Sequence, residues 1–125
     1  MKQIIKTTKA PQAIGPYSQG MVADKFIYTA GQIHLTASGV LVEGTIEEQT
    51  EQVMKNLSEI LIAAGSSFDH VVKTTMYLAD IGDFAKANAV YMKYMSEPYP
   101  ARDTVGVYQL PKGARIEISM IAMKE

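Results

Sequence analysis

The sequence predicts an α+β fold in which a single sheet carries two helices on one face. Two segments, 45–65 and 83–95, place apolar residues at helical spacing, and shorter apolar segments bounded by turn residues lie around them. The expected order is strand, strand, helix, strand, helix, strand, strand. With 125 residues, of which 47% are hydrophobic, the chain is expected to fold as one domain spanning residues 1–125.

The first helix is expected over Thr45–Gly65. Thr45 and Glu48 form a Thr-x-x-Glu capping box, which satisfies backbone donors at a helix N-terminus. Gly65 stands where a left-handed residue usually closes a helix. The apolar residues that recur at helical spacing between these ends are Ile46, Val53, Met54, Leu57, Ile60, Leu61 and Ala64.

The second helix is expected from about Asp83 to Met95. Pro98 prevents its continuation, because proline lacks the backbone N–H that a helix interior requires. The apolar stripe along this helix consists of Phe84, Ala87, Tyr91, Tyr94 and Met95.

Short apolar and β-branched segments predict the strands. These segments are Ile4–Ile5, Met21–Ala23, Phe26–Thr29, Val71–Leu78, Val105–Tyr108 and Arg115–Met123. Asp24 and Lys25 are expected to join the second and third segments in a hairpin. The last two segments are expected to pair with each other around Leu110–Gly113.

The last predicted strand suggests that the protein is an oligomer. By period-two alternation, Ile116, Ile118, Met120 and Ala122 share one face, whereas Arg115, Glu117, Ser119, Ile121 and Met123 share the other. Two helices can cover only the first face, so a monomer would leave Ile121 and Met123 in water. Burial of apolar area favours covering the second face with another copy of the chain. We therefore expect a homo-oligomer.

Composition excludes several classes of function. The formal net charge is −1 and no basic stripe is present, so neither nucleic acids nor anionic membranes are expected partners. The absence of cysteine excludes disulfides, thiolate metal sites and cysteine nucleophiles. No apolar segment approaches the roughly 18 residues of a membrane span, and no signal peptide is recognisable. These features predict a soluble, cytoplasmic protein.

His34 and His70 are the only histidines, and neither stands at a metal-ligand spacing. We expect both to be solvated surface residues, with a catalytic role as the alternative. The sequence also lacks a nucleophile elbow, a Walker loop and a dinucleotide fingerprint. We therefore expect no metal and no cofactor, and a chemistry that uses positioned charge, hydrogen bonds and water.

Four motifs, taken in order, resemble the Rid family, and in particular its RidA-type branch. They are Ile14-Gly15-Pro16-Tyr17-Ser18, Gly31-Gln32, Pro100-Ala101-Arg102 and Ile116-Glu117-Ile118, and the likeness spans nearly the whole chain. The resemblance implies a chorismate-mutase-like fold assembled as a homotrimer, with the sheets facing inward and ligand clefts between subunits. It also implies cofactor-independent hydrolysis of reactive 2-imino and 2-enamino acids (2-aminoacrylate, 2-iminobutanoate, 2-iminopropanoate) to 2-keto acids and ammonia.

The resemblance gives two residues their main roles. Arg102 corresponds to an arginine that binds the substrate carboxylate, a task suited to its planar fork. The alternative is a surface salt bridge with Asp103 or a neighbouring glutamate. Glu117 corresponds to a glutamate that holds or activates the attacking water, and its apolar neighbours should raise its pKa. The alternative for Glu117 is a structural ion pair across the trimer interface, for example with Arg115 or Lys73.

Five further residues are expected at the site. Tyr17 corresponds to a tyrosine that lines the cleft, although a half-buried packing role is the alternative. Gly31 and Thr104 correspond to positions that offer backbone groups to the ligand, and Ala30 lies beside them. Asn88 matches the family pattern, and from its position within a helix we expect it to support the site or a neighbouring loop.

The chain departs from the family pattern at Ala30, Asp103, Gly106 and Ser119. Ala30 stands where serine is common, and Asp103 is close enough in sequence to compete for the fork of Arg102, although strand alternation should turn the two apart. The alternative to the deaminase function is therefore a non-catalytic or regulatory trimer that binds a small carboxylate. A ribonuclease activity, which has been claimed for some members, is disfavoured by the absence of a basic stripe.

Overall fold

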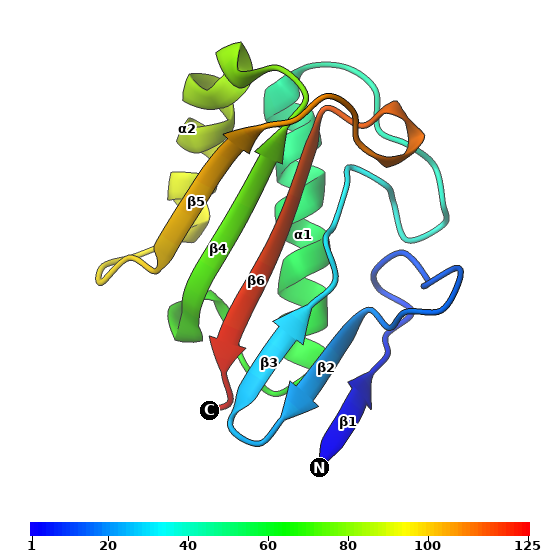
Figure 1. Ribbon diagram of the computed structural model, residues 1–125, viewed down its shortest axis with the longest axis vertical. Helices are drawn as coiled ribbons and strands as arrows, with labels where there is room; N and C mark the ends of the chain where they lie inside the picture. The colour runs from blue at the N-terminus through cyan, green and yellow to red at the C-terminus, as the bar shows by residue number, and fades with distance from the viewer.

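The computed structural model describes residues 1–125 and consists of one six-stranded sheet with both α-helices on the same side (Figure 1). The strand order is β1-β2-β3-β6-β4-β5. The strands are β1 (Lys2–Ile5), β2 (Gly20–Ala23), β3 (Phe26–Thr29), β4 (Val71–Leu78), β5 (Ala101–Gly106) and β6 (Ile116–Met123); the helices are α1 (Ile46–Ala63) and α2 (Phe84–Tyr94). Three short 3₁₀ helices span Phe68–His70, Ile81–Asp83 and Pro111–Gly113. The predicted α+β fold is confirmed.

The first helix begins where the capping box predicted it. The Thr45 side chain accepts a hydrogen bond from the Glu48 amide at 3.1 Å, and the Glu48 carboxylate accepts one from the Thr45 amide at 3.1 Å. The chain leaves the helix through Gly65, which has a φ of +77°. Neither helix is long and apolar enough to cross a membrane.

The N-terminal strands form an antiparallel meander that joins the last strand. Asp24 closes the predicted hairpin between β2 and β3 with a φ of +55°. β3 then pairs with β6, with Tyr28 opposite Ile121. The N-terminal meander and the C-terminal strand therefore meet at the β3–β6 pair near the middle of the sheet, whereas β1 lies at one edge.

The predicted pairing of Val105–Tyr108 with Arg115–Met123 is wrong. β5 begins earlier, at Ala101, and runs parallel to β4 with Thr74 opposite Arg102. β6 instead lies between β3 and β4 and is antiparallel to both. The reason is the helix between β4 and β5: α2 returns the chain to the end where β4 began, and such a crossover connection produces parallel strands.

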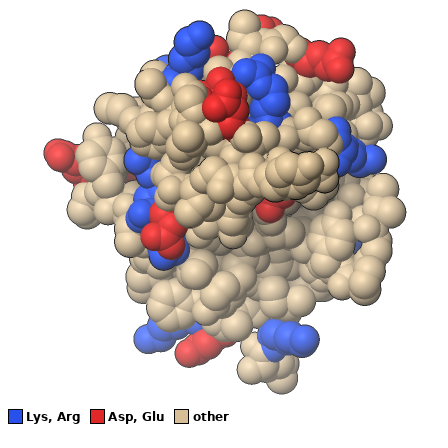
Figure 2. All heavy atoms as spheres, turned by 45° about the horizontal axis from the view of Figure 1, so that its top comes forward, with Lys and Arg blue, Asp and Glu red and all other residues tan.

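The two faces of the sheet differ as the alternation of β6 predicted. Ile116, Ile118, Met120 and Ala122 are at most 2% exposed and pack beneath the helices, whereas Ile121 is only partly buried and Met123 is 41% exposed. Figure 2 views the uncovered face obliquely, and its charged atoms lie mainly toward the margins. Other apolar side chains exposed here are Phe26, Tyr28 and Val105.

Candidate functional site

Arg102 lies on the helix-covered side of the edge strand β5. Its cross-strand partner Thr74 is fully buried, and both side chains point toward α2. Phe84, Asn88 and Tyr91 approach Arg102 from α2, where their spacing of four and three residues places them on one helix face. The arginine therefore extends into the gap between the sheet edge and the second helix.

The guanidinium of Arg102 is held by uncharged groups only. Its Nη1 donates a hydrogen bond to Oδ1 of Asn88 at 2.7 Å. Its Cζ lies 5.2 Å from the ring centroid of Phe84 and 5.1 Å from that of Tyr91, within the range of cation–π attraction. No carboxylate of the chain pairs with it, and its other N–H groups have no partner within the chain. The positive charge thus remains available to an anion.

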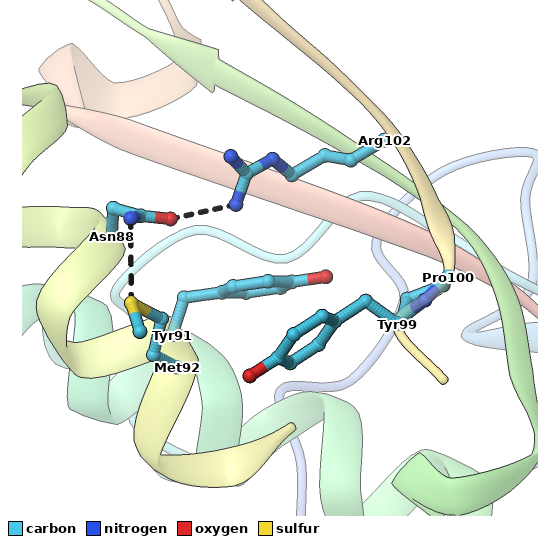
Figure 3. A pocket seen from close by; sticks show the side chains of 6 residues that line it. All are labelled: Asn88, Tyr91, Met92, Tyr99, Pro100 and Arg102. Carbon is cyan, nitrogen blue, oxygen red and sulfur yellow. Dashed lines mark hydrogen bonds between the residues drawn. The ribbon is translucent and has the colours of Figure 1, made fainter. Parts of the chain in front are cut away.

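A cavity of about 340 Å³ opens beside this guanidinium, and we call it the arginine cavity. Figure 3 shows Arg102 reaching over the ring of Tyr91 toward Asn88, with Tyr99 on the far side of that ring. Its volume is at the lower end of the range for small-molecule sites, which suits a small organic acid. Its lining residues are Asn88, Tyr91, Met92, Tyr99, Pro100 and Arg102.

The salt bridge that was the alternative role for Arg102 does not form. Asp103 points to the other face of the strand, where its Oδ2 lies 2.9 Å from Nζ of Lys73. Strand alternation thus separates the two neighbours, as predicted. Thr104, two residues after Arg102, returns to the helix-covered side and is half-buried opposite Met76.

A second, larger cavity of about 650 Å³ lies on the other side of the sheet, and we call it the glutamate cavity. It brings together four residues that the sequence had singled out: Tyr17, Ala30, Gly31 and Glu117. Its remaining walls are Pro11, Gln12, Ile14, Gln19, Gln32, Ile33, Leu35, Pro111 and Lys112. The cavity therefore combines apolar walls and uncharged polar groups with one lysine and one carboxylate, that of Glu117.

Glu117 is half-buried and has no hydrogen-bond or ion-pair partner within the chain. Within the chain, Arg115 and Lys73, the partners suggested for an ion pair across the trimer interface, bind Asp83 and Asp103. Burial raises the pKa of the Glu117 carboxyl above its ordinary value, as the sequence predicted. A carboxyl with a raised pKa exchanges protons closer to neutral pH, which suits general acid–base chemistry.

The other residues of the glutamate cavity are fixed by backbone contacts. The amide of Ala30 donates to the carbonyl of buried Gln19 at 2.8 Å, which ties the N-terminal loop to the end of β3. The Tyr17 hydroxyl accepts a hydrogen bond from the Ile14 amide at 3.3 Å, and the residue is 54% exposed. The Gly31 amide donates no hydrogen bond within the chain. The Gly31 amide and the O–H of Tyr17 therefore donate to no partner within the chain, and both residues line the cavity.

The expectation that both histidines are solvated is wrong for His34, which is 2% exposed. Its Nδ1 donates to the Val42 carbonyl at 2.8 Å, and its Nε2 accepts from the Arg115 amide at 3.0 Å. Burial lowers its pKa, so the ring is neutral and holds the segment after Gly31 against β6. His70 is partly buried, and its Nδ1 lies 3.1 Å from Oγ of Ser67. No local sequence signal marks His34, because its partners are 8 and 81 residues away.

Within a single chain, the expected site residues form two separate groups and not one site. Arg102 and Asn88 line the arginine cavity on the helix-covered side, whereas Glu117 alternates with buried Ile116 and Ile118 and faces the other side. β4 lies between β5 and β6, so their backbones are about 10 Å apart at a strand spacing of about 4.8 Å. A single chain does not bring Arg102 to Glu117.

Comparisons with known proteins cover the whole chain. The family model described as Endoribonuclease L-PSP matches residues 7–124. A human protein named 2-iminobutanoate/2-iminopropanoate deaminase is 49% identical over 125 residues, which cover 99% of this chain and 91% of that protein. The crystal structure of yeast Mmf1 matches with a TM-score of 0.98 and 40% identity over 100% of both chains. That of E. coli TdcF with bound serine matches with a TM-score of 0.92 and 34% identity over 98% of this chain and 99% of the other.

Proposed function

The chain belongs to the family described as Endoribonuclease L-PSP, the Rid family, and from this premise we propose that it hydrolyses reactive 2-imino and 2-enamino acids to 2-keto acids and ammonia. The name of the human relative, which aligns with nearly the full chain, supports this activity. The proposed substrates share a carboxylate next to an electrophilic C=N carbon. The site must therefore bind one anionic group and deliver water to the adjacent carbon.

The observation that carries the proposal is the unpaired charge of Arg102 at a small cavity. Asn88 occupies one edge of the guanidinium, and two aromatic rings approach it, while no acidic side chain competes for it. The remaining donors suit a carboxylate bound through two parallel hydrogen bonds. Each charge-assisted bond contributes roughly 1.5–3 kcal/mol, which is enough to hold a small acid.

We propose that the complete site forms between neighbouring copies of the chain. Arg102 and Glu117 lie on opposite faces of one sheet, so the arginine cavity of one protomer would be completed by the glutamate cavity of the next. The exposed apolar side chains of the uncovered face, including Tyr28 and Met123, favour such an assembly. A homotrimer with the sheets facing inward is the arrangement that the family resemblance implies.

In the proposed mechanism, Arg102 anchors the carboxylate and the backbone near Thr104 and Gly31 orients the imine. Tyr17 lines the cleft around the substrate. Glu117 takes a proton from water as the water oxygen attacks the C=N carbon, the electron pair of the C=N bond moves to nitrogen, and Glu117 returns the proton to that nitrogen. In the resulting tetrahedral intermediate the proton of the hydroxyl group passes to nitrogen, by way of Glu117, as the C–N bond breaks, so that ammonia leaves and the keto group forms. Imines already hydrolyse in water, so positioning and a general base, which typically supplies 10²–10⁴-fold, suffice.

The experiment that tests this proposal generates the substrate in place. A pyridoxal-phosphate-dependent threonine dehydratase releases 2-iminobutanoate, and 2-ketobutanoate formation is followed with and without the protein. We expect acceleration by the wild type and by Lys93→Ala, which removes an exposed cation of α2 that pairs with Glu51. We expect none from Arg102→Ala. Acceleration that survives Arg102→Ala would overturn the proposal.

The same assay tests a second candidate, a non-catalytic protein that binds a small carboxylate. The observation that favours it is that the arginine cavity is formed by one chain alone. This candidate predicts Arg102-dependent binding of 2-ketobutanoate with no effect on imine hydrolysis.

The cytoplasmic location remains a prediction from the sequence.

A further inference from the structure

Gly31 lies two residues after the end of β3. Its backbone conformation does not explain why this residue is glycine. The glycines with a left-handed φ are Gly15, Gly39, Gly44, Gly65 and Gly113, and Gly31 is not among them. The φ of Gly31 therefore does not lie in the region that favours glycine. The requirement for glycine must therefore come from its surroundings.

Those surroundings are the side chain of Glu117. A Cβ at residue 31 would overlap Oε2 of Glu117 and lie 2.7 Å from its Cδ and 3.0 Å from its Cγ. Real Cβ atoms essentially never approach another atom closer than 3.0 Å. The three atoms nearest to such a Cβ all belong to the side chain of Glu117. The carboxylate thus occupies the space that a side chain at residue 31 would fill.

Hydrogen bonds hold the backbone on both sides of Gly31. The Ala30 amide donates to the Gln19 carbonyl at 2.8 Å. Gln32 is 6% exposed and exchanges two backbone hydrogen bonds with Ile118, at 2.9 and 3.1 Å. Two residues further on, His34 is bound to the Arg115 amide at 3.0 Å. The glutamate carboxylate, in contrast, is the end of a flexible side chain with no partner of its own within the chain.

We propose that Gly31 is a positioning residue: by lacking a side chain, it lets the carboxylate of Glu117 fold against its backbone and face the glutamate cavity. The inference rests on the proposed function, in which that carboxylate directs water. It gives Gly31 a role separate from any hydrogen bond that its backbone makes to a ligand. Packing against residue 31 replaces the polar partner that usually fixes a half-buried carboxylate.

The first test is Gly31→Ala. Because hydrogen bonds hold the backbone on both sides and the Glu117 carboxylate is the end of a flexible side chain, the added methyl group should rotate Glu117 away from the cavity. We therefore expect kcat to fall about 100-fold, within the usual contribution of a general base. The matched control is Gly106→Ala on β5, where the nearest atom to an added Cβ lies 3.4 Å away, and where we expect wild-type activity. A wild-type kcat for Gly31→Ala would overturn the inference.

A double-mutant cycle separates the positioning role from a backbone role of Gly31. Glu117→Ala removes the atoms with which the methyl group collides, so Gly31→Ala should cause no further loss of kcat in that background. A further loss of about 100-fold, as in the wild-type background, would overturn the inference. If instead Glu117→Ala itself keeps the wild-type rate, the proposed mechanism fails, and the inference is decided by the titration below.

The readout that does not depend on activity is the ionisation of Glu117, followed by NMR of its side-chain carboxyl carbon. Burial raises the pKa of this group, and Gly31→Ala should move it into solvent and lower the pKa toward the ordinary range. The titratable groups around it are Tyr17 and Lys112 in the same cavity and Tyr77 opposite it on β4, while Arg115 is engaged by Asp83. An unchanged pKa would contradict the inference.

Discussion

The arginine cavity and the glutamate cavity hold opposite charges under different constraints. Arg102 is fixed by neutral partners: it donates a 2.7 Å hydrogen bond to Oδ1 of Asn88 and lies against two aromatic rings, which orient its charge without neutralising it. Glu117 has no polar partner in the chain, and its half-buried position raises its pKa. The first arrangement suits binding of a stable anion, and the second suits proton transfer. Changes at Arg102 should therefore act mainly on KM, and changes at Glu117 mainly on kcat.

Glu117→Gln is expected to have the largest effect. The amide keeps the shape of the carboxyl group but cannot accept a proton from water, so we expect kcat to fall about 10²–10⁴-fold. KM should change by less than about threefold, because Arg102 still binds the carboxylate. Steady-state kinetics with dehydratase-generated 2-iminobutanoate measure both constants. Equal losses in kcat and in affinity for 2-ketobutanoate would instead make Glu117 part of the binding pocket.

Arg102→Lys is expected to have the next largest effect. Lysine keeps the positive charge but loses the planar fork, and one lost charge-assisted bond of roughly 1.5–3 kcal/mol raises KM about 10- to 100-fold. The Kd of 2-ketobutanoate, measured by calorimetry, should rise by a similar factor. Lys93→Arg, an exchange of the same kind at an exposed ion pair, is the control. A wild-type KM for Arg102→Lys would show that a point charge is sufficient.

Asn88→Asp tests whether the partner of Arg102 must be neutral. The aspartate would keep a hydrogen bond to the guanidinium but would add a competing negative charge, and we expect a rise in KM of about 10-fold, equivalent to about 1.4 kcal/mol. Asn88→Ala should raise KM less, because it loses orientation but leaves the charge of Arg102 free. If the two variants behave alike, Asn88 acts through its hydrogen bond alone.

His34→Gln should have the smallest effect on activity at neutral pH and a clear effect on stability. Loss of the paired contacts to Val42 and Arg115 should cost about 1–3 kcal/mol in the free energy of unfolding. Burial lowers the pKa of His34 from 6.5, so the unfolded chain binds its proton more readily. Wild-type stability should therefore fall as the pH decreases below 6.5, and the variant should lack this contribution.

Denaturant unfolding of both proteins at pH 7.5 and pH 5.5 measures the His34 contribution. The difference between the wild type and His34→Gln separates the histidine from the carboxylates, which titrate in both proteins. A difference that stays the same at both pH values would contradict the assignment of a neutral, buried ring.

The local elements were predictable because their signals lie within a few residues. The capping box of Thr45 and Glu48 marked the start of α1, and alternation along β6 separated its buried face from its open face. The pairing of β5 was not predictable in this way. Periodicity shows that a segment is a strand but does not show which neighbour it joins, and the crossover through α2 placed β5 beside β4.

The site was predictable as a set of residues but not as an arrangement. Arg102 and Glu117 could be singled out from their motifs, yet their separation onto opposite faces depends on the order β6-β4-β5. The burial of His34 depends on contacts with Val42 and Arg115, which only the folded chain brings together. The steric relation between Gly31 and Glu117 arises in the same way, from the backbone bridge beside them.

The central claim, that one protomer supplies the arginine and its neighbour the glutamate, is tested most directly by mixing two inactive variants. Arg102→Ala and Glu117→Gln are unfolded together and refolded, so that the oligomers contain both chains. If each site spans two chains of a cyclic trimer, random mixing leaves both residues intact in about one site in four, and about a quarter of the wild-type activity should return. Mixed oligomers that form but remain inactive would contradict a shared site.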